Sequence, residues 1–231
     1  MSKYFPAPET ADEHGIVAIG GQLTVDWLLD AYSHGIFPWP LWEDESFPLT
    51  WFSLEPRAII EFDDLHISKR LARTIRSQKY QVTCDLEFAS VIKHCAEPRH
   101  EEDGVWITSN MIDAYIDLHH AGHAHSIEVW QDHELVGGIY GVAIGGLFAG
   151  ESMFHRQRDA SKVALVALIK HLQHCGFALF DIQQLTPHTE SMGAKEISRA
   201  EYLSRLQPAI GLSASFGTEL QGSQQSIIDS K

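Results

Sequence analysis

The chain has 231 residues, of which 44% are hydrophobic and 21% are charged, as in ordinary globular proteins. No apolar run approaches the ~20 residues of a membrane-spanning helix, and no secretory signal opens the chain, so we expect a cytoplasmic protein. Its 17 basic and 31 acidic residues give a net charge of −14, which excludes nucleic-acid binding except through a local basic patch.

The first 57 residues differ in sequence pattern from the rest and are predicted to form a small separate domain. Residues 1–20 are loop-like. Thr24 is a candidate N-cap of a helix that stops at Gly35. Residues 36–56 combine aromatic side chains with four prolines, which excludes a regular helix and predicts an irregular aromatic wall.

Residues 58–211 are predicted to form one domain of the α/β or α+β class, with helices flanking a mixed sheet. Apolar periodicity and capping residues predict helices at 68–79, 86–97, 108–122 and 159–176. Strands are expected at 58–62, 80–85 and 177–185, with two or three more within 124–154. Residues 212–231, rich in Ser, Gln and Gly, are expected to be a disordered tail.

A basic run lies on the helix predicted at 68–79, in a segment without any acidic residue. Lys69, Arg73 and Arg76 are spaced to share one helical face, and Arg70 adjoins them. Such a face can bind a phosphate backbone without reading its sequence. A solvated helix face is the alternative, and the spacing alone favours it.

Cysteine and histidine patterns give no strong metal signal. The three cysteines form no CxxC pair, so neither a disulfide framework nor a thiolate site is predicted. Four histidines lie within residues 119–126, but Gly122 interrupts the helix there and no HExxH motif is present. Histidines near a helix C-terminus also interact favourably with its dipole, so no metal is expected.

Three polar side chains lie in otherwise apolar surroundings. Asp181 and Gln183 are two apart on a predicted strand and therefore on one face, where they are either functional or simply exposed. Glu151 follows a small apolar strand, and burying a carboxylate costs several kcal/mol unless a cation meets it. That cation is either Arg156 or Arg158 of this chain, or part of a substrate.

Trp39 and Trp106 stand at chain turns, in "GIFPWP" and "GVWITS". Such rings can stack a nucleobase, at ~1–3 kcal/mol per base. More often, tryptophans of this kind fill a core or an interface.

Taken together and in order, several strings resemble the bacterial leucyl/phenylalanyl-tRNA–protein transferase family. They include "GIFPW", "WITSNMIDAY", "GHAHSIEVW", "ELVGGIYGVAIG", "GESMF", "DIQ" and "HTESMGAKEISRAEYL". The resemblance covers residues 5–210, and the histidine-containing and "GESMF" strings are unusual enough to make it specific.

The resemblance implies a small N-terminal domain and a C-terminal domain similar to N-acetyltransferases (the GNAT fold). It implies transfer of Leu or Phe, and less well Met, from aminoacyl-tRNA to proteins that begin with Lys or Arg. The modified proteins would be marked for N-end rule degradation. Neither a metal nor acetyl-CoA is implied, and we expect a monomer without membrane contact.

The resemblance also assigns roles to residues of this chain. Glu151 would meet the basic side chain of the acceptor, Asp181 and Gln183 would be catalytic, and Trp39 and Trp106 would hold the terminal adenosine. Four basic residues would bind the tRNA backbone: Lys69, Arg70, Arg73 and Arg76. The donor pocket would comprise Ile139, Phe148, Met153, Leu165, Leu168, Leu172 and Phe180. The family often has Met at position 139 and Phe at positions 168 and 172, so the pocket is less aromatic here.

Two other functions are compatible with parts of the pattern. An acyl-CoA-dependent N-acetyltransferase would need a glycine-rich loop for the pyrophosphate, and "HRQRDASK" before the long helix contains no glycine. A non-catalytic adaptor for basic N-termini would need Glu151, but neither the Asp181–Gln183 pair nor the basic helix.

Overall fold

The computed structural model describes residues 1–40, 48–98 and 107–221. Its N-terminal part contains a three-stranded antiparallel sheet in the order β1 (Ile16–Ile19), β3 (Thr50–Phe52), β2 (Phe37–Pro38). Beside it lie a short 3₁₀ turn, η1 (Pro8–Thr10), and helix α1 (Val25–Ser33). The expectation of loop alone in residues 1–20 was therefore wrong at β1, which pairs with β3.

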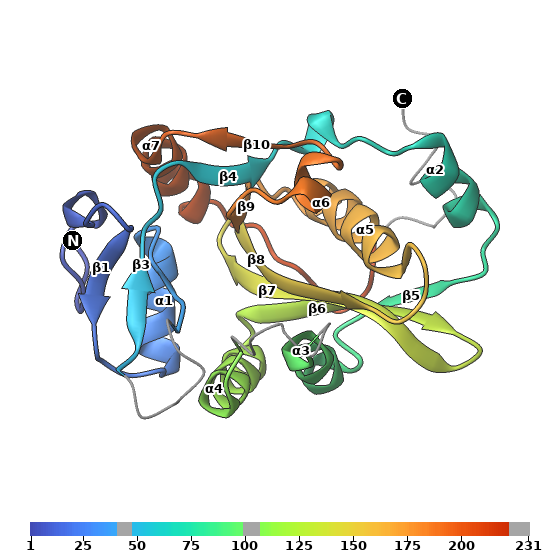
Figure 1. Cartoon of the computed structure of the whole chain (residues 1–231), viewed down its shortest axis with the longest axis horizontal. Coiled ribbons are helices and arrows are strands. Elements are labelled where there is room, and N and C mark those ends of the chain that lie inside the picture. The colour runs from blue at the N-terminus through green and yellow to red at the C-terminus, as the bar shows by residue number, and fades with distance from the viewer. Residues whose placement is uncertain (41–47, 99–106, 222–231) are drawn as a thin grey trace.

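The C-terminal part is built on a seven-stranded mixed sheet in the order β10-β4-β9-β8-β7-β6-β5 (Figure 1). Among the strands of the described residues, only β8 and β9 pair in parallel; the other neighbours in this sheet are antiparallel. The strands are β4 (Arg57–Ile60), β5 (Gln81–Cys84), β6 (Ala124–Gln131), β7 (Glu134–Ile144), β8 (Leu147–His155), β9 (Leu179–Gln183) and β10 (Ala194–Ile197). Arg57, the last residue that we assigned to the small domain, is thus the first residue of the large sheet.

Helices cover both faces of this sheet (Figure 1). Helix α5 (Ala160–His174) packs on β6, β7 and β8, while α3 (Phe88–Ala96) and α4 (Ser109–His120) cover the opposite face. The others are η2 (Phe62–Asp64), α2 (Lys69–Arg76), α6 (Pro187–Glu190) and α7 (Arg199–Ile210). The predicted helices are confirmed to within a few residues. Ser68 caps α2 as the sequence suggests, and Thr108 caps α4. Elements α6, β10 and α7 were not predicted, and neither were β2 and β3, which lie within the segment expected to be irregular.

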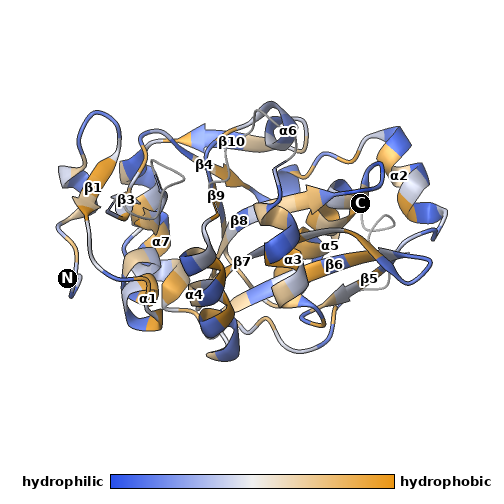
Figure 2. Cartoon of the chain, turned by 60° about the horizontal axis from the view of Figure 1, so that its bottom comes forward, coloured by the Kyte–Doolittle hydropathy of each residue, from blue (hydrophilic) through white to orange (hydrophobic). Residues whose placement is uncertain are grey.

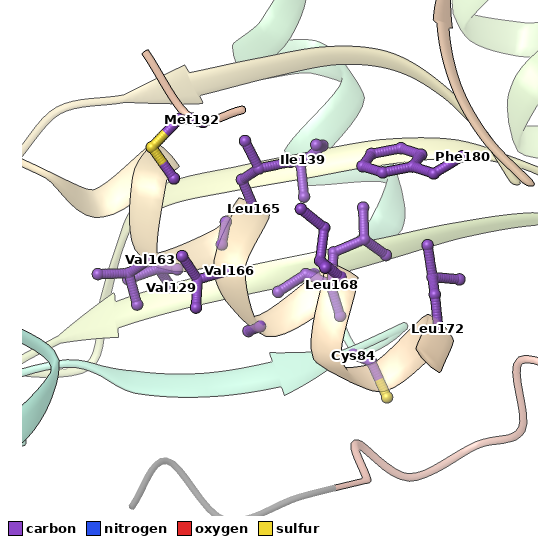
Figure 3. Packing of buried hydrophobic residues seen from close by; sticks show 14 of the residues in the cluster. Cys84, Val129, Ile139, Val163, Leu165, Val166, Leu168, Leu172, Phe180 and Met192 are labelled. Carbon is purple, nitrogen blue, oxygen red and sulfur yellow. The ribbon is translucent and has the colours of Figure 1, made fainter. Parts of the chain in front are cut away.

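One core cluster lies between α5 and the sheet, and a second lies on the face covered by α3 and α4. Figure 2 shows hydrophobic stretches on inner strands such as β6 and β8, interrupted by hydrophilic residues. Figure 3 shows Leu165, Leu168 and Leu172 of α5 packed beside Ile139 and Phe180. Within the described residues, no helix is long and apolar enough to cross a membrane.

The segment after α7 differs from the disordered tail that we expected. Residues 212–221 are described, and Phe216 is only 2% exposed within the core against α5. The prediction relied on the Ser-, Gln- and Gly-rich composition of the segment and gave no weight to its one aromatic residue, Phe216.

Candidate functional site

A cavity of about 320 Å³ opens where β8 and β9 separate. Their pairing runs from Leu147 opposite Leu179 to Ala149 opposite Asp181 and ends there. The next residues of both strands, 150–153 and 182–184, line the cavity. Phe37, Pro38 and Trp39 form a further part of the wall, and residues around α6 and the start of α5 complete it. The cavity therefore follows directly from the divergence of two parallel strands.

Glu151 reaches this cavity from a β-bulge. The register of β7 and β8 steps from Tyr140 opposite Ser152 to Gly141 opposite Gly150, so Glu151 is the extra residue on β8. Bulges of this kind redirect a side chain and are common beside active sites. Neutral donors hold the carboxylate, among them the Tyr115 hydroxyl at 3.0 Å from Oε2 and Gln183 Nε2 at 2.9 Å from Oε1.

Burial raises the pKa of Glu151 to about 7. Hydrogen bonding from Tyr32 and Tyr115 opposes that rise, the charge of Asp181 adds to it, and the charge of Arg57 reduces it. Among the described residues, no lysine or arginine forms an ion pair with Glu151. Arg156, one of the two candidates from the sequence, instead pairs with Glu97 at 3.0 Å. The carboxylate is therefore held by neutral donors, and its burial favours the protonated form.

Asp181 lies beside the cavity and is completely buried. Arg57 binds it with two parallel hydrogen bonds, Nε to Oδ1 at 2.9 Å and Nη2 to Oδ2 at 2.6 Å. The Tyr202 hydroxyl donates to Oδ2 at 2.8 Å. Arg57 is itself 1% exposed, lies over the rings of Phe37 and Tyr202, and donates to the carbonyl of Gly35 at 3.2 Å. Asp181 is thus a fixed anion within a closed network.

Gln183 differs from the arrangement that strict strand alternation predicts. Its φ of 56° is left-handed, and the register of β4 and β9 shifts around Ile182. Asp181 Oδ1 accepts the backbone N–H of Gln183 at 2.9 Å, while the side-chain amide donates to Glu151. The prediction that both side chains share one face was wrong in this respect: Asp181 fixes the backbone of Gln183, and the amide is free of Asp181.

The seven predicted donor-pocket residues form two layers. Ile139, Met153 and Leu165 line the cavity. The other four, Phe148, Leu168, Leu172 and Phe180, are at most 1% exposed and pack in the core behind that lining. Figure 3 shows Leu168, Leu172 and Phe180 among them. The assignment of all seven to a donor pocket stays a prediction.

Only one of the two tryptophans can be placed. Trp39 lines the cavity beside Phe37, with ring centroids 6.4 Å apart, whereas Trp106 lies outside the described residues.

The basic side chains of α2 are exposed, but they are not equivalent. Arg70 pairs with Asp159 at 2.9 Å, next to the start of α5. Lys69, Arg73 and Arg76 form no ion pair with any residue that the structure describes. They are therefore available to an external anion, whereas Arg70 is partly neutralised.

Two of the four histidines within residues 119–126 form hydrogen bonds inside the protein. His119 bonds the carbonyl of Ala124 through Nδ1 at 2.7 Å, and His125 bonds Asp85 at 2.7 Å. No group of residues suited to hold a metal ion occurs in the described part of the chain.

Sequence reasoning missed Arg57, Tyr115 and Tyr202, which hold the polar groups of the site. One signal was available: an arginine that opens the apolar strand "RAII" is expected to have a buried partner. Nothing in the sequence identifies that partner, because it lies 124 positions further along the chain.

Comparison with known proteins identifies the family. The model of the leucyl/phenylalanyl-tRNA protein transferase family matches residues 59–207, and that of its N-terminal domain matches residues 21–55. The chain belongs to this family.

Curated members of the family are similar over most of their length. A leucyl/phenylalanyl-tRNA–protein transferase from Solidesulfovibrio magneticus is 52% identical over 89% of this chain and 82% of its own. Those from Pseudomonas fluorescens and Shewanella pealeana are 50% and 48% identical, covering 87% and 86% of this chain and 90% and 84% of their own.

Solved structures are more distant. L-PGS from Bacillus licheniformis has a TM-score of 0.43 at 13% identity, over 80% of this chain and 69% of its own. A GCN5-related N-acetyltransferase from Kribbella flavida has a TM-score of 0.41 at 9% identity, over 74% and 60%. These scores are too low to carry an argument, so the α+β class with a mixed sheet rests on the strand order itself.

Proposed function

We propose that the chain transfers Leu or Phe, and less well Met, from aminoacyl-tRNA to the α-amino group of proteins that begin with Lys or Arg. The observation that carries this proposal is Glu151, a carboxylate in a cavity where the described residues supply neutral donors and no paired cation. Such a site favours a ligand that brings its own positive charge, as a basic N-terminal side chain does. Its pKa of about 7 would fall when that charge arrives.

The chemistry needs an amine held in line with an ester carbonyl. The α-amine nitrogen forms a bond to the aminoacyl carbonyl carbon, the ester bond to the ribose oxygen breaks, and the amine proton ends on that leaving oxygen. Gln183 donates to Glu151 and can offer its own carbonyl oxygen to the attacking amine. An amide is a weak base, so Gln183 would act by positioning the amine. Asp181 would act indirectly, by fixing the backbone of Gln183.

The donor would lie along the same cavity. Trp39 offers a ring face for the terminal adenosine, with Trp106 as its predicted counterpart outside the described residues. Ile139, Met153 and Leu165 offer apolar surface for the donor side chain. The exposed cations of α2 would neutralise tRNA phosphates. We further propose a cytoplasmic monomer whose products are degraded by the N-end rule.

A transfer assay tests this function. The protein is mixed with leucyl-tRNA and a peptide that begins with Arg, beside a peptide that begins with Ala, and products are weighed by mass spectrometry. We expect a leucine-sized gain on the Arg peptide alone. In a parallel reaction, acetyl-CoA replaces the charged tRNA. Acetyl transfer there, without aminoacyl transfer from tRNA, would contradict the proposal and favour the acetyltransferase alternative. Binding of the Arg peptide without turnover from leucyl-, phenylalanyl- or methionyl-tRNA would favour an adaptor.

A further inference from the structure

The C-terminal segment 212–221 packs one aromatic side chain into the core behind the cavity. Phe216 lies between three rings: His125 at a centroid distance of 4.3 Å, His171 at 4.4 Å and Phe148 at 5.7 Å. The His125 and Phe148 rings are nearly parallel to it, at 12° and 26°. Phe216 is therefore a well-packed core residue, although the segment that carries it has no regular secondary structure.

His171 of α5 fastens this segment at two points. Its Nε2 bonds the carbonyl oxygen of Phe216 at 2.8 Å, and the backbone N–H of Gln221 donates to its Nδ1 at 3.0 Å. His171 is fully buried and stands between Leu168 and Leu172 on the same helix. His171, which anchors the segment, and the two predicted donor-pocket residues thus lie within little more than one turn of α5.

A short series of contacts links Phe216 to the cavity. Phe148, which Phe216 stacks on, also packs edge-on against Phe180 at 5.9 Å. A side chain placed on Gly150, which lines the cavity, would meet the Phe180 ring at 3.0 Å. Phe180 therefore lies directly behind the lining, Phe148 behind Phe180, and Phe216 behind Phe148. Because close-packed side chains transmit volume changes, the last ring in the series affects how far the first can yield.

We propose that Phe216 is a specificity-determining residue that limits the size of the donor side chain by fixing Phe148. This inference rests on the function proposed above. Strands β8 and β9 supply the rest of this wall and are held by sheet hydrogen bonds. The segment that carries Phe216 has fewer such restraints. Replacing Phe216 should therefore enlarge the pocket with a smaller loss of stability than replacing a residue of either strand.

The test is a competition between donors in the full-length protein. Phe216→Ala and the milder Phe216→Leu are compared with wild type for transfer of Leu, Phe and Trp from their charged tRNAs to one Arg peptide. We expect the Phe-to-Leu ratio of kcat/KM to rise by about three- to tenfold in Phe216→Ala, since direct pocket contacts give about tenfold or more and Phe216 acts through another ring. Phe216→Leu should lie between, and Phe216→Ala should gain measurable Trp transfer.

Phe154→Ala is the matched control. Phe154 is also buried, at 6% exposure, but belongs to the core cluster on the other face of the sheet. It should lose stability without changing donor preference. A gain of Trp transfer cannot arise from partial unfolding, so it would support the inference even if Phe216→Ala is less stable. Unchanged donor ratios in both Phe216 variants, with wild type active, would overturn the inference alone. Absence of transfer by wild type would instead overturn the proposed function and, with it, the inference.

Discussion

Replacing Glu151 by Gln should stabilise the fold in a pH-dependent way. The folded-state pKa of Glu151 is about 7, against an ordinary value of 4.5. The folded protein therefore binds more protons than the unfolded chain between these values, and its stability falls as pH rises through this window. The full pKa shift corresponds to a loss of about 3 kcal/mol in the free energy of unfolding. About 2 kcal/mol of this loss occurs between pH 5 and pH 8, once partial solvent contact is allowed for. Glu151→Gln removes this loss, because an amide does not titrate.

Urea unfolding of wild type and Glu151→Gln at pH 5 and pH 8 measures the effect. The variant's stability relative to wild type should be about 2 kcal/mol more favourable at pH 8 than at pH 5. Any hydrogen-bond change from the substitution is present at both pH values and cancels. Glu97→Gln is the control: hydrogen bonds from His94 and Arg156 hold the pKa of Glu97 below its ordinary value, so it cannot give this trend. Equal differences for Glu151→Gln at both pH values would refute the argument that the Glu151 carboxylate is costly to ionise.

The remaining predictions concern the transfer reaction. Affinity of wild type for an Arg peptide, followed by calorimetry, should rise about tenfold from pH 6 to pH 8 as Glu151 ionises; a flat profile would exclude that carboxylate as the binding anion. Arg57→Lys keeps the charge but loses the fork on Asp181, so kcat should fall at least about tenfold with a smaller change in KM; unchanged kcat in steady-state assays would remove Arg57 from the positioning network. Replacing Lys69 and Arg73 together by Ala should reduce the salt slope of tRNA binding by about 1.5, and an unchanged slope in filter binding would exclude α2 from the tRNA path.

The regular elements could be predicted because their signals are local. Thr24, Ser68 and Thr108 each lie at the start of an apolar helical pattern, and in each case the side chain accepts the backbone N–H expected of an N-cap. The order of these elements predicted an α/β or α+β domain with a mixed sheet, and the strand order confirms the α+β class. The strand β1 was missed because a four-residue strand carries little periodicity, and its partner β3 lies about thirty residues away.

The polar groups of the site were identified, but their arrangement was not. Period-two alternation placed Asp181 and Gln183 on one face, and the left-handed φ of Gln183 breaks that rule. A bulge depends on the partner strand as well as on the bulged one, so the single sequence could not reveal it. The partner of Asp181 was equally hidden, because Arg57 reaches it across the sheet from the adjacent strand β4.

These irregularities have a common consequence for function. The bulge at Glu151 on β8 and the left-handed Gln183 on β9 each lie two residues past the point where β8 and β9 stop pairing with each other. Each irregularity changes the direction of a polar side chain from the one that regular strand alternation would give. As a result, Gln183 Nε2 lies 2.9 Å from Glu151 Oε1. Backbone strain at such positions persists only when the surroundings hold it. The Arg57–Asp181 pair provides that support, because Asp181 accepts the backbone N–H of Gln183. Loss of Arg57 should therefore separate Gln183 from Glu151 before it disturbs the distant core.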